Sequence, residues 1–112
     1  MRVYLSGPVT GLPHGEAHAA FEGAAGALAA AGHSVWSPVD NVPAGTGHER
    51  AMAICLHALT SWRLWETPFD ALVLMHGWER SEGCRAELAV ARACGIRAMG
   101  IDEALRGGGL SG

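Results

Sequence analysis

Apolar and polar positions alternate along this chain in two periods, one typical of strands and one typical of helices. Residues 70–75 (DALVLM) are almost continuously apolar, which indicates a parallel strand covered on both faces. Shorter strands are predicted at 3–6, 33–37 and 96–101. Between the strands, helical spacing predicts helices at 16–31, 48–62 and from 81 or 82 to 94.

The remaining segments are rich in turn residues or are irregular. They comprise the loop at 39–47, an aromatic stretch at 63–69, at most a short helical turn at 102–106, and a flexible Gly-rich tail at 107–112. Strands that alternate with helices predict a single α/β domain over 1–106, built on a parallel sheet with right-handed crossovers. Ligands bind such open sheets beyond the carboxyl ends of the strands. The loops at 7–15 and 77–81 both lie at that edge, so we expect them to form one cleft.

Composition narrows the class of protein. Of the 112 residues, 49% are apolar and 17% are charged, as in a globular domain, and the net charge of −3 argues against a nucleic-acid partner. A transmembrane run and a signal peptide are both missing, so we expect a cytoplasmic protein without a membrane partner. Three cysteines without CxxC spacing suggest reduced thiols. The many Ala and Gly residues leave few large side chains for a core, which makes a homodimer plausible.

The stretch 78–87 (WERSEGCRAE) carries the first candidate chemistry. Ser81 precedes a helix whose free backbone amides favour an anion, and a simple N-cap explains the same serine equally well. Glu87 lies between one and two turns inside this helix and borders its apolar stripe. It is either a solvated glutamate or a nucleophile or base beside the anion site. Gly83 and Trp78 flank these residues, and Trp78 could stack on a base or serve as an interface or lid residue.

The first strand brings a second set of candidates. Its alternation places Tyr4 and Ser6 on one face, one residue before Gly7-Pro8 ends the strand. Tyr4 is a core aromatic or a catalytic phenol. Among the six histidines there is no HxxH or HExxH spacing, and the chain has neither GxGxxG nor GxxxxGK[ST]. We therefore predict no metal site and no cofactor.

Two segments together carry a family resemblance. Residues 1–10 (MRVYLSGPVT) and 70–87 (DALVLMHGWERSEGCRAE) resemble the nucleoside 2-deoxyribosyltransferase-like superfamily, in particular its short phage and bacterial members catalogued as a domain of unknown function. The resemblance extends from residue 1 to about 101 and is weaker in the middle. It implies a flavodoxin-like three-layer sandwich with a four- to five-stranded parallel sheet, and N-glycosidic bond chemistry on a nucleoside or nucleoside 5′-monophosphate.

The resemblance also assigns roles to residues. It implies that Glu87 is the nucleophile, that Ser81 contacts phosphate or sugar, and that Tyr4 assists catalysis. The expected catalytic set is then Glu87 and Tyr4, and the expected substrate-binding set is Ser6, Gly7, Pro8, Thr10, Trp78, Ser81 and Gly83. In related enzymes a carboxylate attacks the anomeric carbon, and water or a second base resolves the glycosyl ester. Relatives complete their sites across a dimer interface.

One position departs from the family pattern. Related enzymes carry an aspartate on the helix before the central strand, and Cys55 occupies that place if 60–69 is an insertion. Glu49 or Asp40 could supply the missing carboxylate instead. The sequence therefore predicts an N-glycosidase or deoxyribosyltransferase. It leaves two alternatives: a nucleotide-binding module without turnover, or an interaction domain whose surface is formed by Trp62, Trp65 and Phe69.

Overall fold

The computed structural model describes residues 1–9, 12–62 and 66–106. Predictions that concern Thr10, Trp65 or the tail at 107–112 fall outside these residues. The strands are β1 (Arg2–Ser6), β2 (Ser34–Trp36), β3 (Ala71–Leu74) and β4 (Arg97–Gly100). The helices are α1 (His14–Ala30), α2 (Pro38–Asn41), α3 (His48–Leu59), the 3₁₀ turn η1 (Trp78–Arg80), α4 (Glu82–Ala93) and α5 (Ile101–Leu105).

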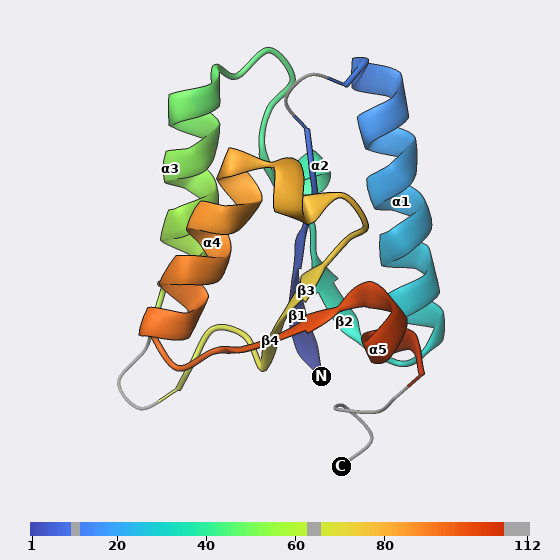
Figure 1. Cartoon of the computed structure of the whole chain (residues 1–112), viewed down its shortest axis with the longest axis vertical. Helices are drawn as coiled ribbons and strands as arrows, with labels where there is room; N and C mark the ends of the chain where they lie inside the picture. The colour runs from blue at the N-terminus through green and yellow to red at the C-terminus, as the bar shows by residue number, and fades with distance from the viewer. Residues whose placement is uncertain (10–11, 63–65, 107–112) are drawn as a thin grey trace.

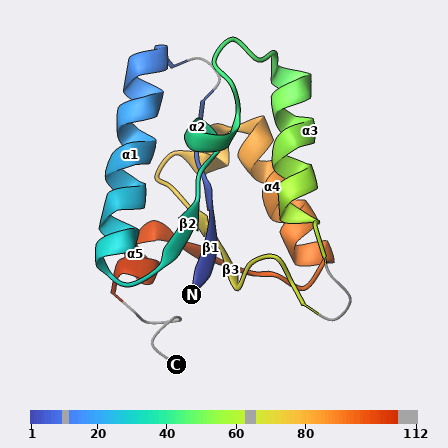
Figure 2. The same ribbon diagram turned by 180° about the vertical axis from the view of Figure 1, so that it is seen from behind.

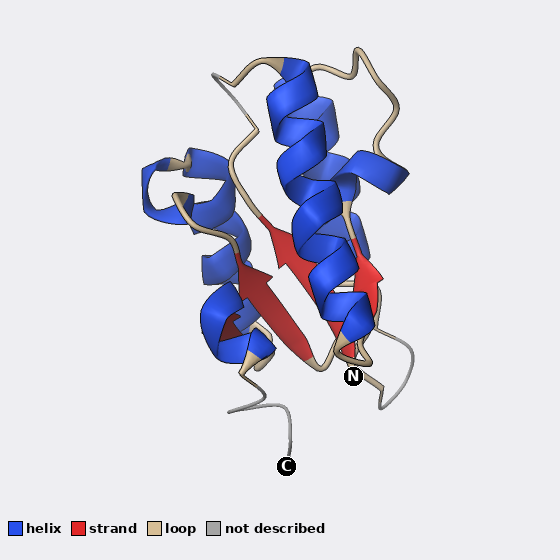
Figure 3. Cartoon of the chain, turned by 90° about the vertical axis from the view of Figure 1, so that its right-hand side faces the viewer, coloured by secondary structure: helices blue, strands red, loops and turns tan. Residues whose placement is uncertain are grey.

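The four strands form one parallel sheet in the order β2-β1-β3-β4. Seen edge-on in Figure 1, the sheet lies between α3 and α4 on one side and α1 and α5 on the other. The strand arrows in Figure 3 point toward the same end of the molecule. This arrangement confirms the predicted α/β fold, a flavodoxin-like three-layer sandwich.

Strand alternation divides the core into two parts. Val3 and Leu5 of β1 face α1 and α5, where Phe21 and Leu28 are fully buried. Tyr4 faces α3 and α4 in the second cluster, as the period of two predicts. All four residues of β3 are buried, because helices cover both faces of this central strand. The side chains that emerge from β1 toward α4 are therefore those that can reach a site on that helix.

Helix ends follow local chemistry. Gly32 and Gly95, just after α1 and α4, have φ values of 96° and 75°, the left-handed conformation that glycine adopts without strain. The predicted extension of α3 to residue 62 is wrong. The Thr60 hydroxyl donates to the Leu56 carbonyl and the Ser61 hydroxyl to the His57 carbonyl, so side chains bond the carbonyls of the last turn.

Two short helices also differ from the prediction. The segment predicted as a loop at 39–47 begins with α2, which starts at Pro38 and lies between α1 and α3 in Figure 2. α5 is a five-residue helix with Ile101 and Ala104 buried against the sheet. Phe69 was expected at an interaction surface, but it is buried and contacts the Tyr4 ring edge-on. Trp62 is exposed.

Within the described residues, none of the helices combines the length and the apolar character needed to cross a membrane.

Gly7 has no space for a side chain. A Cβ there would lie 2.5 Å from the Met75 sulfur and 3.1 Å from both Met75 Cβ and Phe21 Cζ. We expect Gly7→Ala to lower the free energy of unfolding by about 1–3 kcal/mol, because the core must shift to accept the methyl group. Urea denaturation measures this change. The control, Gly26→Ala, places a methyl group where no atom lies within 4 Å and should stabilise α1 by about 0.5–1 kcal/mol. Equal stability of the two variants would contradict the packing argument.

Candidate functional site

The Glu87 carboxylate is the chemical centre of the molecule. Glu87 projects from α4 onto the sheet and is 6% exposed. Its Oε2 accepts a hydrogen bond from the Tyr4 hydroxyl, and its Oε1 accepts one from the Ser6 hydroxyl at 2.8 Å. Both donors lie on β1, on the face turned toward α4. The structure thus brings Glu87 together with two residues that lie more than eighty positions earlier in the chain.

Tyr4 is fixed by aromatic packing. Its ring stacks on Trp36 with centroids 4.9 Å apart and an angle of 13° between the planes, and Phe69 meets its other side edge-on at 5.5 Å. The side chain is fully buried. Burial, and to a smaller extent the adjacent Glu87 carboxylate, raises the pKa of the Tyr4 phenol far above its ordinary range. Tyr4 therefore stays protonated, and its hydroxyl donates a hydrogen bond to Glu87.

Burial also raises the pKa of Glu87, and the hydrogen bonds from Tyr4 and Ser6 partly oppose this effect. Among the residues that the structure describes, Glu87 has no ion-pair partner. A carboxylate desolvated in this way, without a cation beside it, is more basic than a surface glutamate. Its remaining lone pairs are available to a ligand, because each carboxylate oxygen can accept more than one bond.

Two thiols complete the surroundings of this carboxylate. Cys55 on α3 is buried beside the Tyr4 hydroxyl, and Cys84 on α4 is buried beside the Ser6 and Ser81 hydroxyls. Burial raises the pKa of both thiols. Of the three residues considered as substitutes for the family's aspartate, Cys55 alone reaches this cluster; Glu49 and Asp40 are exposed.

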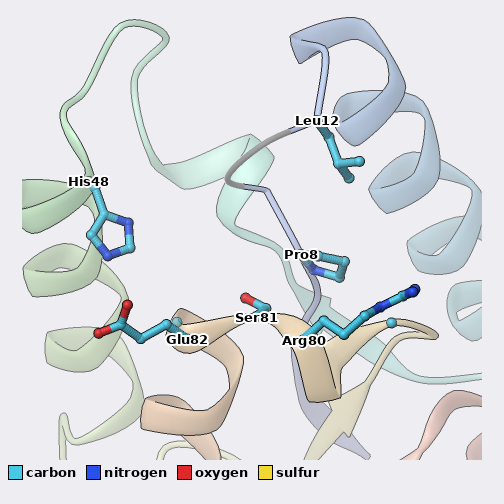
Figure 4. Close-up of a pocket in the computed structure, with 8 residues that line it drawn as sticks. Pro8, Leu12, His48, Arg80, Ser81 and Glu82 are labelled. Carbon is cyan, nitrogen blue, oxygen red and sulfur yellow. The ribbon is translucent and has the colours of Figure 1, made fainter.

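The carboxylate opens onto a small cavity that adjoins a larger cleft. The small cavity, of about 60 Å³, is lined by Gly7, Met52, Cys84 and Glu87 among others. The larger cleft measures about 510 Å³ and is bounded by Pro8, Leu12, Arg80 and Glu82. His48, Ser81 and Gly83 line both spaces. Figure 4 shows His48 and Glu82 pointing toward one another on one side of the cleft, with Pro8 and Leu12 on the other.

The start of α4 forms the floor of the cleft. The Ser81 hydroxyl accepts a hydrogen bond from the Cys84 amide at 3.3 Å, so Ser81 is the N-cap that its position indicates. The cap does not exclude a ligand, since other amides of the first turn have no partner within the helix.

Residues 1–99 match the model of a family described as a domain of unknown function, DUF4406. The chain belongs to this family. Neither the curated proteins nor the solved structures contain a significant match. The family match covers every residue of the Glu87 cluster and of both adjoining cavities. The site described above is therefore part of the family domain rather than an addition to it.

The predicted site residues fall into three groups. Glu87, Tyr4 and Ser6 form the hydrogen-bonded cluster, and Gly7, Pro8, Ser81 and Gly83 line the adjoining cavities. Trp78 lies elsewhere: it is half-buried and lines a separate cavity beside β4 and α5. Thr10 lies outside the described residues. Metal ligation was not predicted, and the described residues contain no group of three His, Cys, Asp or Glu side chains placed to hold an ion.

Sequence reasoning named Cys55 on α3 but missed the other residues that this helix contributes. His48 and Met52 line the cavity beside Glu87, and Cys55 contacts Tyr4. These residues follow one another at intervals of four and three positions, which places them on one face of the helix. That spacing was visible in the sequence. The direction of this face toward Glu87 was not, because it depends on how α3 packs against α4.

The raised pKa of Glu87 has a consequence for stability. A carboxyl group whose pKa is higher in the folded state binds more protons there, so the free energy of unfolding falls as pH rises through that folded pKa. We therefore expect Glu87→Gln to be more stable than wild type at neutral and alkaline pH. The advantage should shrink as pH falls below the folded pKa toward about 4.5, because the wild-type carboxyl is then neutral as well. Each unit of pKa shift corresponds to about 1.4 kcal/mol.

Denaturant titrations from pH 4 to 9 measure this difference. Glu82→Gln is the matched control, since it changes an exposed carboxylate five positions earlier in the same helix. A constant difference between Glu87→Gln and wild type across this range would show that desolvation of Glu87 does not affect folding.

Proposed function

We propose that this protein cleaves the N-glycosidic bond of a nucleoside or nucleoside 5′-monophosphate, by hydrolysis or by deoxyribosyl transfer, with Glu87 as the nucleophile. The observation that carries the proposal is the desolvated Glu87 carboxylate, oriented by two β1 hydroxyls and facing a cavity at the ligand-binding edge of a parallel sheet. The resemblance to nucleoside 2-deoxyribosyltransferase-like enzymes points to the same residue.

The geometry suits a double displacement. One Glu87 oxygen forms a bond to the anomeric carbon while the bond from that carbon to the base nitrogen breaks, and the base leaves with the bonding electrons and gains a proton. Water, or a second base, then attacks the same carbon and releases the carboxylate. Hydrogen bonds from Tyr4 and Ser6 fix the carboxylate for attack and stabilise it again when it departs.

The two cavities beside Glu87 would hold different parts of the ligand. A cleft of about 510 Å³ is within the usual size of small-molecule sites, about 300–1,000 Å³. The 60 Å³ cavity has the volume of about two water molecules, so it admits only the reacting edge of a sugar. The larger part of a nucleotide would lie over the start of α4, where backbone amides and Arg80 favour a phosphate.

A panel of nucleosides and 5′-monophosphates tests the proposal. We expect wild type to release free base from at least one of them, measured by liquid chromatography. We expect Glu87→Gln to lower the rate by a factor of about 10³ or more, because the amide cannot form the glycosyl ester. Acid quenching followed by mass spectrometry should find the sugar attached to the peptide that contains Glu87.

Glu103→Gln is the control for this experiment, since it changes an exposed carboxylate on α5 that lines neither the cleft nor the Glu87 cavity. Base release that is unaffected by Glu87→Gln would rule out Glu87 as the nucleophile. Wild type that releases no base from the whole panel would rule out the glycosidase proposal.

A second candidate is a nucleotide-binding module without turnover. Two observations favour it: Glu87 is almost inaccessible, and a thiol, Cys55, contacts Tyr4 where related enzymes carry an aspartate. Calorimetry with the same panel separates the two candidates. A nucleotide that binds at micromolar concentration and is recovered intact would favour the module.

We further propose that the protein is a cytoplasmic homodimer. Relatives complete their sites across a dimer interface. In this chain Val9 and Leu12 are exposed apolar side chains that line cavities near the Glu87 site. Light scattering during gel filtration should give twice the chain mass of 11.6 kDa. Val9→Asp, at the exposed rim, is expected to shift the mass toward that of a single chain, whereas His57→Asp at the opposite end of α3 is not. A wild-type mass of 11.6 kDa at all concentrations would exclude the dimer.

A further inference from the structure

Cleavage of a glycosidic bond needs a proton donor for the departing base, as well as a nucleophile. Tyr4 fixes the Glu87 carboxylate, and its geometry does not favour it as the proton donor for the base. Its hydroxyl already donates to Glu87, its ring is fully buried between Trp36 and Phe69, and it lines neither of the two cavities. Among the described residues, a better-placed donor is a titratable side chain that lines the cavities.

The described residues that line the two cavities include five titratable or charged groups. They are His48, Arg80, Glu82, Cys84 and Glu87. Arg80 and Glu82 line the larger cleft and not the cavity beside Glu87. An arginine, moreover, does not give up its proton in proteins. Cys84 is 1% exposed, and burial raises the pKa of its thiol.

His48 meets the remaining requirements. It is the first residue of α3, it is exposed, and it lines both the Glu87 cavity and the cleft. It therefore stands at the junction between the place where the sugar would react and the place where the rest of the ligand would lie. Imidazole is also the side chain that most readily gains and loses a proton near neutral pH.

We propose that His48 is the acid and base of this site, a role that rests on the proposed glycosidase function. As the bond to the base breaks, protonated His48 gives its proton to the base nitrogen, so the base leaves neutral. In the second step neutral His48 takes a proton from the attacking water, and the electron pair of the ester bond returns to Glu87. The net reaction is nucleoside plus water to sugar plus base, with both residues regenerated.

Several charged side chains lie in the same region as His48. Glu82 and Arg80 line the cleft with it, Glu87 lines the smaller cavity with it, and Glu49 and Arg50 follow it on α3. Figure 4 shows the Glu82 carboxylate on the same side of the cleft as the imidazole. We expect the pH profile of kcat in wild type to contain a limb that is absent in His48→Ala.

The test compares wild type, His48→Ala and a matched control, His57→Ala. His57 lies on the same helix, is also exposed, and lines a cavity at the other end of the sheet. For a nucleoside that wild type cleaves, His48→Ala should lower kcat by about 10²–10⁴-fold with little change in KM. Added imidazole should restore part of the rate. On an activated analogue whose base leaves without a proton, His48→Ala should lose much less of its kcat. His57→Ala should behave as wild type on both substrates.

The possible outcomes separate the two proposals. If wild type releases base and His48→Ala has the same kcat, or loses equally on both substrates without rescue by imidazole, the role of His48 is refuted and the glycosidase function stands. If wild type releases base from no substrate, both proposals fail. Circular dichroism of the variant checks that the loss does not come from unfolding. His48→Gln, which retains a polar side chain but no titratable proton, should repeat the kinetic defect.

Discussion

The organisation of this protein depends on one buried carboxylate. Glu87 is buried, and the described part of the chain places no cation beside it; a pair of hydroxyl donors on the neighbouring strand compensates for the lost water. Those donors must be two residues apart on β1 so that both face α4. Tyr4 must also be held rigidly, which its stacking on Trp36 and its contact with Phe69 achieve. The aromatic packing around Tyr4 thus supports the hydrogen-bonded cluster of Tyr4, Ser6 and Glu87.

Buried carboxylates that lack an ion pair raise the question of function, because a well-packed apolar residue would be more stable in the same place. In this protein the carboxylate borders a cavity, and the cavity borders a cleft of ligand size. The same desolvation that disfavours the charged state of Glu87 makes it a stronger base and nucleophile. Stability and reactivity are in opposition here, as they often are where a fold carries a site.

The two faces of the sheet differ in the residues that they bury. The face toward α1 and α5 carries an apolar cluster that extends from Val3 and Leu5 to Ile101 and Ala104. The face toward α3 and α4 contains the polar cluster next to the Glu87 cavity and, farther from that cavity, an apolar core that includes Leu59 and Leu88. Gly7 lies where the two regions meet, and the close approach of Met75 and Phe21 explains why it has no side chain.

Much of this arrangement followed from the sequence. Near-continuous apolar residues identified β3, helical spacing identified α1, α3 and α4, and alternation in β1 placed Tyr4 and Ser6 together, because these periods are imposed by backbone geometry alone. Ser81 was correctly placed at the start of α4 by its capping chemistry. α2 was not predicted and α5 was predicted only as at most a short helical turn at 102–106, since such short segments carry little periodicity and their formation depends on contacts with the rest of the chain.

Tertiary structure alone decided which side chains meet. The sequence contained His48, Met52 and Cys55 at helical spacing, but only the packing of α3 against α4 turns that face toward Glu87. It also separated residues that are close in sequence: Trp78 lies near Ser81 in the chain and yet lines a different cavity. Local periodicity fixes the direction of a side chain relative to its own helix or strand. The position of that helix or strand relative to others depends on burial across the whole core, which no single segment encodes.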